Sequence, residues 1–200
     1  IDIWFLNEIE KSFNVTPEST PTSILKMLGW TDEDLDTKDK KNSLRENRVY
    51  KLVDTCSAEF ESKTPYLYST NGSEDDDQTS KNKKVVVIGS GPNRIGQGIE
   101  FDYCCVHGVE SLKENEYESI MINSNPETVS TDYDTADKLY FEPLSWDEVS
   151  SVLKREQPDS VIIQLGGQTP LKLAKKIYKA GYNIAGSSLE VIEATEDRNL

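Results

Sequence analysis

The chain has 200 residues and a formal net charge of −14 at pH 7. This negative field disfavours nucleic acid as a partner, because bringing it toward phosphates costs affinity. No apolar run approaches the roughly 18 residues of a membrane helix and no signal peptide is recognisable, so we expect a soluble protein without a membrane partner.

Residues 1–69 are predicted to be mainly α-helical. In IDIWFLNEIEKSF the apolar residues recur at the spacing of a helix with one buried face, and shorter helical pieces are predicted in SILKMLG and over residues 31–47. Residues 49–70 are expected to be extended. The stretch TNGSEDDDQTSKNKK, residues 70–84, has almost no apolar side chains and is predicted to be a linker between two domains.

Downstream, over residues 85–195, short β-branched runs alternate with amphipathic stretches. This alternation is typical of βαβ units and predicts an α/β fold, a Rossmann-like doubly wound parallel sheet. A helix is expected from about Ile95 to Lys113. The expected strands are Lys84–Gly89, Glu118–Asn123, residues 138–143, Ser160–Gly167 and Tyr182–Gly186.

The chain offers little for metal or triad chemistry. Cys56, Cys104 and Cys105 have neither the number nor the spacing of a disulfide framework or zinc site, and His107 is the sole histidine. A multi-histidine metal site or a His-based triad is therefore excluded within this chain. We expect no metal site in it.

Function is expected at the carboxyl ends of the strands, where doubly wound sheets meet their ligands. The first such loop begins with Gly89 and Gly91, but Arg94 stands where a dinucleotide fingerprint needs a small residue, and NSNPE follows the second strand in place of a ribose-binding acid. This disfavours a nicotinamide-dependent oxidoreductase, which stays as an alternative. The loop, with Gly96 further along and with Glu100 and Asp102 in the first turns of the helix that follows, is either an anion-handling loop or a structural tight turn.

Two further loops are polar. Residues 123–137, which follow a strand, are rich in amide, hydroxyl and carboxylate side chains. This composition is typical both of a passage for a small polar substrate and of an ordinary surface turn. In GGQTP, Gly166 and Gly167 allow close backbone approach, while Gln168 and Thr169 present polar groups at a helix start. Three polar loops at one sheet edge favour a site more than each does alone.

A specific resemblance covers these loops. GSGPNRIGQGIEFDYCC, INSNPETVSTDYDTADKLYFEP, QLGGQTPLKLA and the closing EDR resemble the large (synthetase) chains of carbamoyl-phosphate synthases, in the second of their two homologous halves. The resemblance implies that residues 1–69 are part of the helical oligomerisation domain and that residues 85–195 are the pre-ATP-grasp domain. Residues 196–200 would begin an ATP-grasp domain, so we expect this chain to be a piece of a longer polypeptide.

The family is a group of ligases that serve pyrimidine and arginine biosynthesis. They use bicarbonate, ammonia and two ATP, and the second half phosphorylates carbamate. The resemblance implies a passage by which carbamate reaches the second ATP site, with Arg94, Glu100 and Glu127 on its wall. Because carbamate decomposes in water, an enclosed path would prevent side reactions. Further candidates are Asn125, Thr128, Ser130, Gln168 and Thr169. All of these residues, Arg94, Glu100 and Glu127 included, could instead form internal salt bridges and loop braces.

The same resemblance implies the cofactors and partners. Mg-ATP, with Mg²⁺ or Mn²⁺ and with K⁺ as a further ion, would be bound by the full-length enzyme, and this chain alone would bind no cofactor and be inactive. The expected partners are the rest of the synthetase chain and a glutaminase subunit or fused domain, in an oligomer. The expected compartment is the cytoplasm, with the mitochondrion open in a eukaryote. A non-catalytic interaction module is the remaining alternative.

Overall fold

The computed structural model describes residues 3–15, 19–27, 30, 35, 48–61, 63–92 and 98–196. The chain divides into two compact units, Ile1–Val49 with Thr70–Glu74, and Tyr50–Ser69 with Asp75–Leu200. The first unit contains the helices α1 (Ile3–Phe13) and α2 (Thr22–Met27). The helical piece predicted over residues 31–47 lies outside the described residues, apart from Leu35.

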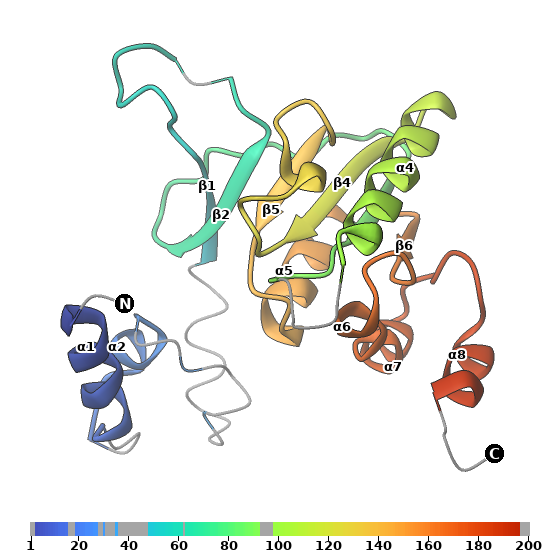
Figure 1. Cartoon of the computed structure of the whole chain (residues 1–200). Helices are drawn as coiled ribbons and strands as arrows, with labels where there is room; N and C mark the ends of the chain where they lie inside the picture. The colour runs from blue at the N-terminus through green and yellow to red at the C-terminus, as the bar shows by residue number, and fades with distance from the viewer. Residues whose placement is uncertain are drawn as a thin grey trace. The chain divides into compact units, whose positions relative to one another are not determined.

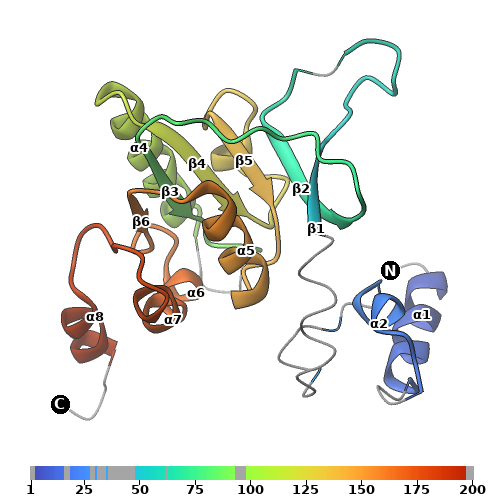
Figure 2. The same cartoon turned by 180° about the vertical axis from the view of Figure 1, so that it is seen from behind.

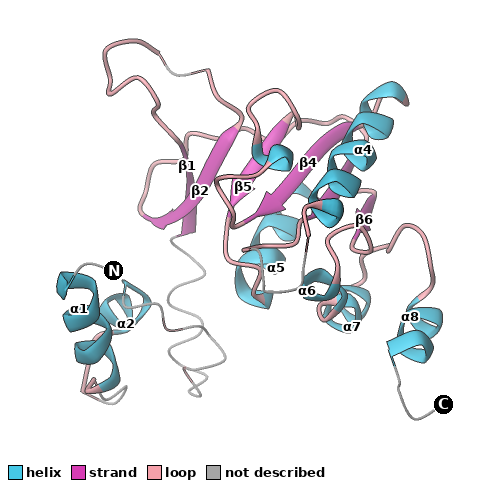
Figure 3. Ribbon diagram, viewed as in Figure 1, coloured by secondary structure: helices cyan, strands magenta, loops and turns pink. Residues whose placement is uncertain are grey.

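The expected α/β fold is present as a sheet of six strands with helices on both faces (Figures 1 and 3). The strands are β1 (Arg48–Leu52), β2 (Tyr66–Asn71), β3 (Lys84–Ile88), β4 (Glu118–Asn123), β5 (Lys138–Phe141) and β6 (Ser160–Ile162). The helices are α4 (Glu100–Glu114), the 3₁₀ turn η1 (Val129–Thr131), α5 (Trp146–Glu156), α6 (Gln168–Leu171), α7 (Ala174–Lys179) and α8 (Leu189–Glu196).

The strand order is β1-β2-β5-β4-β3-β6, and the pairs β2–β5, β5–β4, β4–β3 and β3–β6 are all parallel. From β3 the chain therefore adds β4 and then β5 on one side of this strand. It then crosses back and adds β6 on the other side of β3. This places the topological switch point between β3 and β6, which is where open α/β sheets bind their ligands.

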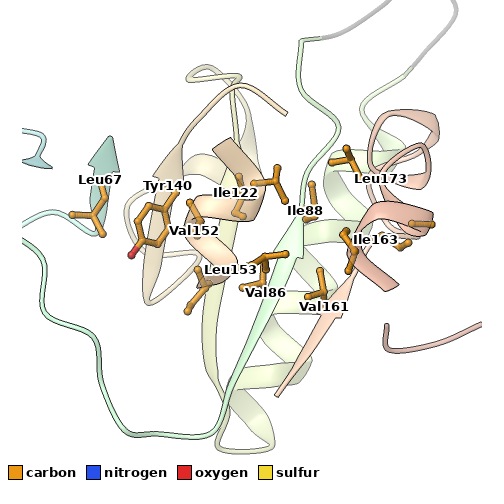
Figure 4. Close-up of a cluster of buried hydrophobic side chains, with 14 of the residues drawn as sticks. Leu67, Val86, Ile88, Ile122, Tyr140, Val152, Leu153, Val161, Ile163 and Leu173 are labelled. Atoms are coloured by element: carbon orange, nitrogen blue, oxygen red, sulfur yellow. The ribbon is translucent and has the colours of Figure 1, made fainter. Parts of the chain in front are cut away.

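Each face of the sheet is covered by its own layer of helices, because successive residues of a strand point to opposite faces. Val86 and Ile88 of β3 pack in the larger core cluster with side chains of α5 and α7 (Figures 2 and 4). Val87, between them, packs in a smaller cluster with Cys105 and Val109 of α4. Burial on both faces explains why β3 is a continuous apolar run with no alternation.

Two predicted elements differ from the structure. Over residues 182–186 there is a single parallel bridge, Val161 to Ile184, instead of a strand, and Gly186 leaves the extended region with φ of +101°. The strand predicted over Ser160–Gly167 ends at Ile162. In addition, β2, from the segment before the predicted linker, pairs in parallel with β5, so the sheet extends beyond residues 85–195.

Part of the predicted linker is bound along the amino edge of the sheet. The Arg155 guanidinium donates to the carboxylates of Asp75 and Asp77, at 2.6 and 2.9 Å, and Lys138 Nζ lies 2.8 Å from Asp77. Lys51 forms a further ion pair of 2.9 Å with Asp76. The three consecutive aspartates of this acidic stretch therefore each meet a cation, which attaches residues 75–77 to the α/β unit.

Candidate functional site at the carboxyl edge

The loops after β3 and β6 touch at the switch point. A Cβ added at Gly166 would lie 2.6 Å from the Ile88 carbonyl oxygen and 2.7 Å from that of Gly89. Such distances are shorter than any real Cβ contact, so the two main chains approach this closely because residue 166 has no side chain. The glycine pair predicted to allow close approach thus does so between two loops, with Gly167 adopting φ of +72° beside it.

Asn123, the last residue of β4, connects the first loop to the second. Its side chain is completely buried, and its Oδ1 accepts hydrogen bonds from the backbone N–H groups of Gly91 (3.1 Å), Ser124 (2.9 Å) and Asn125 (3.3 Å). Its Nδ2 donates to Ser130 Oγ at 3.2 Å. One amide therefore positions the turn after β3, the start of the loop after β4, and η1.

Asp102 connects the same loop to helix α4. Its carboxylate, only 2% exposed, accepts hydrogen bonds from the backbone N–H of Ser130 (2.9 Å) and from its hydroxyl (2.5 Å). The carboxylate belongs to the first turn of a 15-residue helix, where the helix dipole favours negative charge. Ser130 is itself completely buried, so its polar groups are used inside the protein.

The two glutamates predicted from the sequence lie on either side of this contact. Glu100 is the first residue of α4 and is exposed, and Glu127 is exposed in the loop after β4, where its backbone N–H donates to Asn125 Oδ1 at 3.0 Å. Arg94 and Gly96 lie outside the described residues.

The remaining predicted residues divide between two places. Thr128 is half-buried, and its carbonyl accepts hydrogen bonds from the backbone N–H and hydroxyl of Thr131, which closes the turn of η1. Gln168 is exposed and donates to Glu196 of α8 at 3.2 Å, with half-buried Thr169 beside it. The loop after β4 therefore joins the loop after β3 and helix α4, whereas Gln168 is directed to the last helix.

The sequence placed Asp102 in the first turns of the helix but predicted no role for it in the passage, and it did not single out Asn123. Asn123 has a recognisable signal, because it is an amide that directly follows the apolar run Ile120–Ile122. Asp102 has only the weak signal of an acid in the first turn of a helix, which is common at exposed positions and does not predict burial. Its partner Ser130 is 28 residues away, and no local pattern joins the two.

The described residues present no metal centre. No group of three or more His, Cys, Asp and Glu side chains among them is arranged to hold a metal ion. Near Asp102, burial first, and then the charge of Asp102, raise the pKa of the Cys105 thiol to about 12, which makes this cysteine unreactive. No helix in the described part of the chain has the length and apolar character to cross a bilayer.

Residues 81–194 match the family described as the carbamoyl phosphate synthase pre-ATP-grasp domain. This range contains all three loops and both side chains that connect them. The chain belongs to the carbamoyl phosphate synthase pre-ATP-grasp family. A nicotinamide-dependent oxidoreductase is not favoured, in agreement with the missing third glycine of the first loop.

Carbamoyl phosphate synthase large chains are similar over almost the whole of this chain. Those of Archaeoglobus fulgidus, Clostridium acetobutylicum and Deinococcus radiodurans are 48%, 50% and 49% identical, and each alignment covers 99% of this chain. The chain spans only about a fifth of the length of these relatives, 20% to 21%.

Among solved structures, a biotin carboxylase domain of a thermophilic 2-oxoglutarate carboxylase bound to ADP is similar at 21% identity and a TM-score of 0.40. That similarity covers 59% of this chain and 26% of the other.

Proposed function

We propose that this chain is a segment of a full-length carbamoyl-phosphate synthase large chain, a ligase, in the half that phosphorylates carbamate. The observation that carries the proposal is the family match over residues 81–194, which includes every loop of the candidate site. The similarity of the whole chain to carbamoyl phosphate synthase large chains supports it further. Residues 85–195 would be the pre-ATP-grasp domain, residues 1–69 part of an oligomerisation domain, and residues 196–200 the start of the ATP-grasp domain.

In this reaction a carbamate oxygen attacks the γ-phosphorus of ATP, the bond to ADP breaks, and carbamoyl phosphate and ADP are formed. ATP would supply the phosphoryl group. The ATP-grasp domain would bind it together with Mg²⁺ or Mn²⁺ and with K⁺. The contribution of this segment would be to keep carbamate away from water and to direct it, because the anion decomposes in solution. The segment by itself would be inactive.

The loops at the carboxyl edge would form part of the carbamate passage. Glu100, at the start of α4, and Glu127, in the loop that the Asp102–Ser130 contact joins to α4, are both exposed, so their carboxylates could accept hydrogen bonds from the amino end of carbamate. Arg94 would balance its negative charge. Asn125, Thr128, Gln168 and Thr169 are secondary candidates, Ser130 acts as a brace, and the backbone is shaped by Gly89, Gly91, Gly96, Gly166 and Gly167.

The partners follow from the same proposal. The rest of the synthetase chain would cover this segment, a glutaminase subunit or fused domain would supply ammonia, and the enzyme would form an oligomer. Pyrimidine and arginine synthesis would place it in the cytoplasm, or in the mitochondrion of a eukaryote. The net charge of −14 fits the absence of nucleic acid among these partners.

The test compares Glu100→Gln and Glu127→Gln in the full-length synthetase chain that carries this segment. The enzyme is supplied with ammonia, bicarbonate and Mg-ATP, and both the carbamoyl phosphate formed and the ATP hydrolysed are measured. We expect hydrolysis to continue while product falls. Glu114→Gln is the matched control, because Glu114 is also exposed and ends the helix that Glu100 begins.

A chimera gives a second test. The matching segment of the Clostridium acetobutylicum large chain is replaced by this chain, which is 50% identical to it. We expect the chimera to make carbamoyl phosphate. A full-length chain that forms none from ammonia, bicarbonate and Mg-ATP, together with an inactive but folded chimera, would refute the proposed function.

A further inference from the structure

We propose that Asp102 and Ser130 are positioning residues that set the relative placement of Glu100 and Glu127 in the proposed passage. This inference rests on the proposed function and adds two buried residues that touch no substrate. The observation behind it is the double hydrogen bond by which a single carboxylate of α4 holds a single serine of η1, at 2.9 and 2.5 Å.

The connection from this contact to each exposed glutamate is short. Glu100 and Asp102 both belong to the first turn of α4, whose helical backbone fixes their relation. On the other side, the backbone N–H of Thr131 donates to the Thr128 carbonyl at 3.1 Å, and that of Glu127 donates to Asn125 Oδ1 at 3.0 Å. The loop between Asn125 and Thr131 is thus internally hydrogen-bonded, and moving Ser130 would move Glu127 with it.

Asn123 restrains the same loop from the opposite side. Its Nδ2 donates to Ser130 Oγ at 3.2 Å while its Oδ1 accepts from the N–H of Gly91 at 3.1 Å. The Ser130 hydroxyl therefore donates to Asp102 and accepts from Asn123, and all three side chains are buried. A shift of the loop would leave buried polar groups without partners, which is costly.

Stability alone does not require this arrangement. An apolar pair of similar volume would hold η1 against α4 without burying a carboxylate. Two hydrogen bonds from one residue to one carboxylate, however, define both a distance and an orientation, which apolar contact does not. The polar bridge therefore sets the placement of helix α4, which carries the exposed Glu100, relative to the loop after β4, which carries the exposed Glu127.

The opposite edge of the sheet provides a matched control. Ser119, at the amino end of β4, is also completely buried and donates from its backbone N–H (2.8 Å) and hydroxyl (2.7 Å) to the carboxylate of Asp137. Ser119→Ala removes a buried hydroxyl from a serine–aspartate pair, as Ser130→Ala does, but at the amino edge of the sheet, where the loop after β4 ends at the exposed Asp137.

The experiment uses the full-length synthetase chain with Ser130→Ala, Asp102→Asn or Ser119→Ala, and measures carbamoyl phosphate formed per ATP hydrolysed. We expect this ratio to fall by roughly 10-fold in Ser130→Ala, since misplaced groups lose productive geometry. A smaller fall is expected in Asp102→Asn, which keeps the side-chain volume and one acceptor, and the wild-type ratio is expected in Ser119→Ala. Loss of folded protein lowers hydrolysis and product together, so it leaves the ratio unchanged.

Each outcome decides one point. If Ser130→Ala and Asp102→Asn keep the wild-type ratio, or if Ser119→Ala lowers it equally, the positioning role is overturned while the proposed function stands. If Ser130→Ala has no measurable turnover, the positioning role is judged from Asp102→Asn alone, by its carbamoyl phosphate formed per ATP hydrolysed. Absence of product from the wild-type chain refutes the proposed function instead.

Discussion

Lys84 and Glu156 form an ion pair of 2.9 Å in which both side chains are almost completely buried. Lys84 begins the central strand β3, and Glu156 ends α5, so the pair joins a strand to the helix that covers it at the amino edge of the sheet. Glu156 also accepts hydrogen bonds from Lys138 at 3.0 Å and from the Tyr140 hydroxyl at 2.5 Å. The carboxylate thus has three partners in place of water.

Lys84→Met should destabilise the chain strongly. It leaves the Glu156 carboxylate buried with one cation fewer, and breaking a buried pair in this way costs about 3 to 5 kcal/mol. Lys175→Met removes the lysine of the exposed pair with Glu193, 3.0 Å long, and should cost at most about 1 kcal/mol. The free energy of unfolding from urea titrations checks both. Equal losses would contradict the assignment of Lys84 to the buried pair.

Tyr140→Phe tests the hydroxyl that Glu156 shares with Asp77. Its removal takes away the one hydroxyl proton that these two buried carboxylates share and should cost about 1 to 3 kcal/mol. Burial first, and then the charge of Glu156, raise the pKa of Tyr140 far above its usual 10.0. The unfolded chain therefore loses this proton first as pH rises, and wild-type stability should fall above about pH 10.

In Tyr140→Phe this alkaline decrease should be smaller. Urea titrations at neutral pH and above pH 10 measure it, and a matching decrease in both proteins would assign the alkaline effect to other groups.

Asp77 should contribute to acid unfolding. Burial acts to raise the pKa of Asp77, but hydrogen bonds from Lys138, Arg155 and Tyr140 outweigh it and hold the pKa below 3.8. A lowered pKa gives stability that is present above about 3.8 and is lost as pH falls through the folded-state value. In Asp77→Asn the free energy of unfolding should be lower at neutral pH and should depend less on pH in the acid range. If the free energy of unfolding of Asp77→Asn depended on acid pH as strongly as that of the wild type, Asp77 would already be solvated in the folded chain.

Gly166→Ala should disturb the switch point. The added Cβ would meet backbone atoms at 2.6 to 2.7 Å, which cannot rotate away, so a loss of about 1 to 3 kcal/mol is expected. At Gly72 the nearest atom to an added Cβ is at 3.4 Å, an ordinary contact, so Gly72→Ala should be neutral. Thermal unfolding of the two variants compares them, and a stable Gly166→Ala would mean that the two loops separate easily.

The neighbouring cysteines should differ in reactivity. Cys104 is exposed, whereas Cys105 is buried with its pKa raised to about 12. An alkylating reagent at neutral pH should therefore modify Cys104 in the folded chain and Cys105 only after unfolding, because the thiolate is the reactive form. Peptide mass spectrometry distinguishes the two sites. Equal native modification would show that α4 opens readily.

The local sequence was sufficient to predict the strands of the central sheet. Continuous β-branched runs predicted β3 and β4, because strands buried on both faces need apolar side chains at every position. The glycines and polar residues after these strands also predicted where the loops would meet, because parallel strands end at one edge of the sheet. Over residues 182–186, by contrast, a short apolar run with glycines at both ends looked like a strand, although it makes a single bridge.

The sequence by itself therefore determined the α/β class, the strand-end loops and the family, since these depend on patterns within a few residues of one another. Only the tertiary structure decided that β2 pairs with β5, that Asp75 and Asp77 bind Arg155, and that Asp102 holds Ser130. These contacts join residues far apart in the chain, and a single acid or serine has the same local pattern whether it is solvated or buried. Folding gives each of them its partner, and burial then makes the loss of that partner costly.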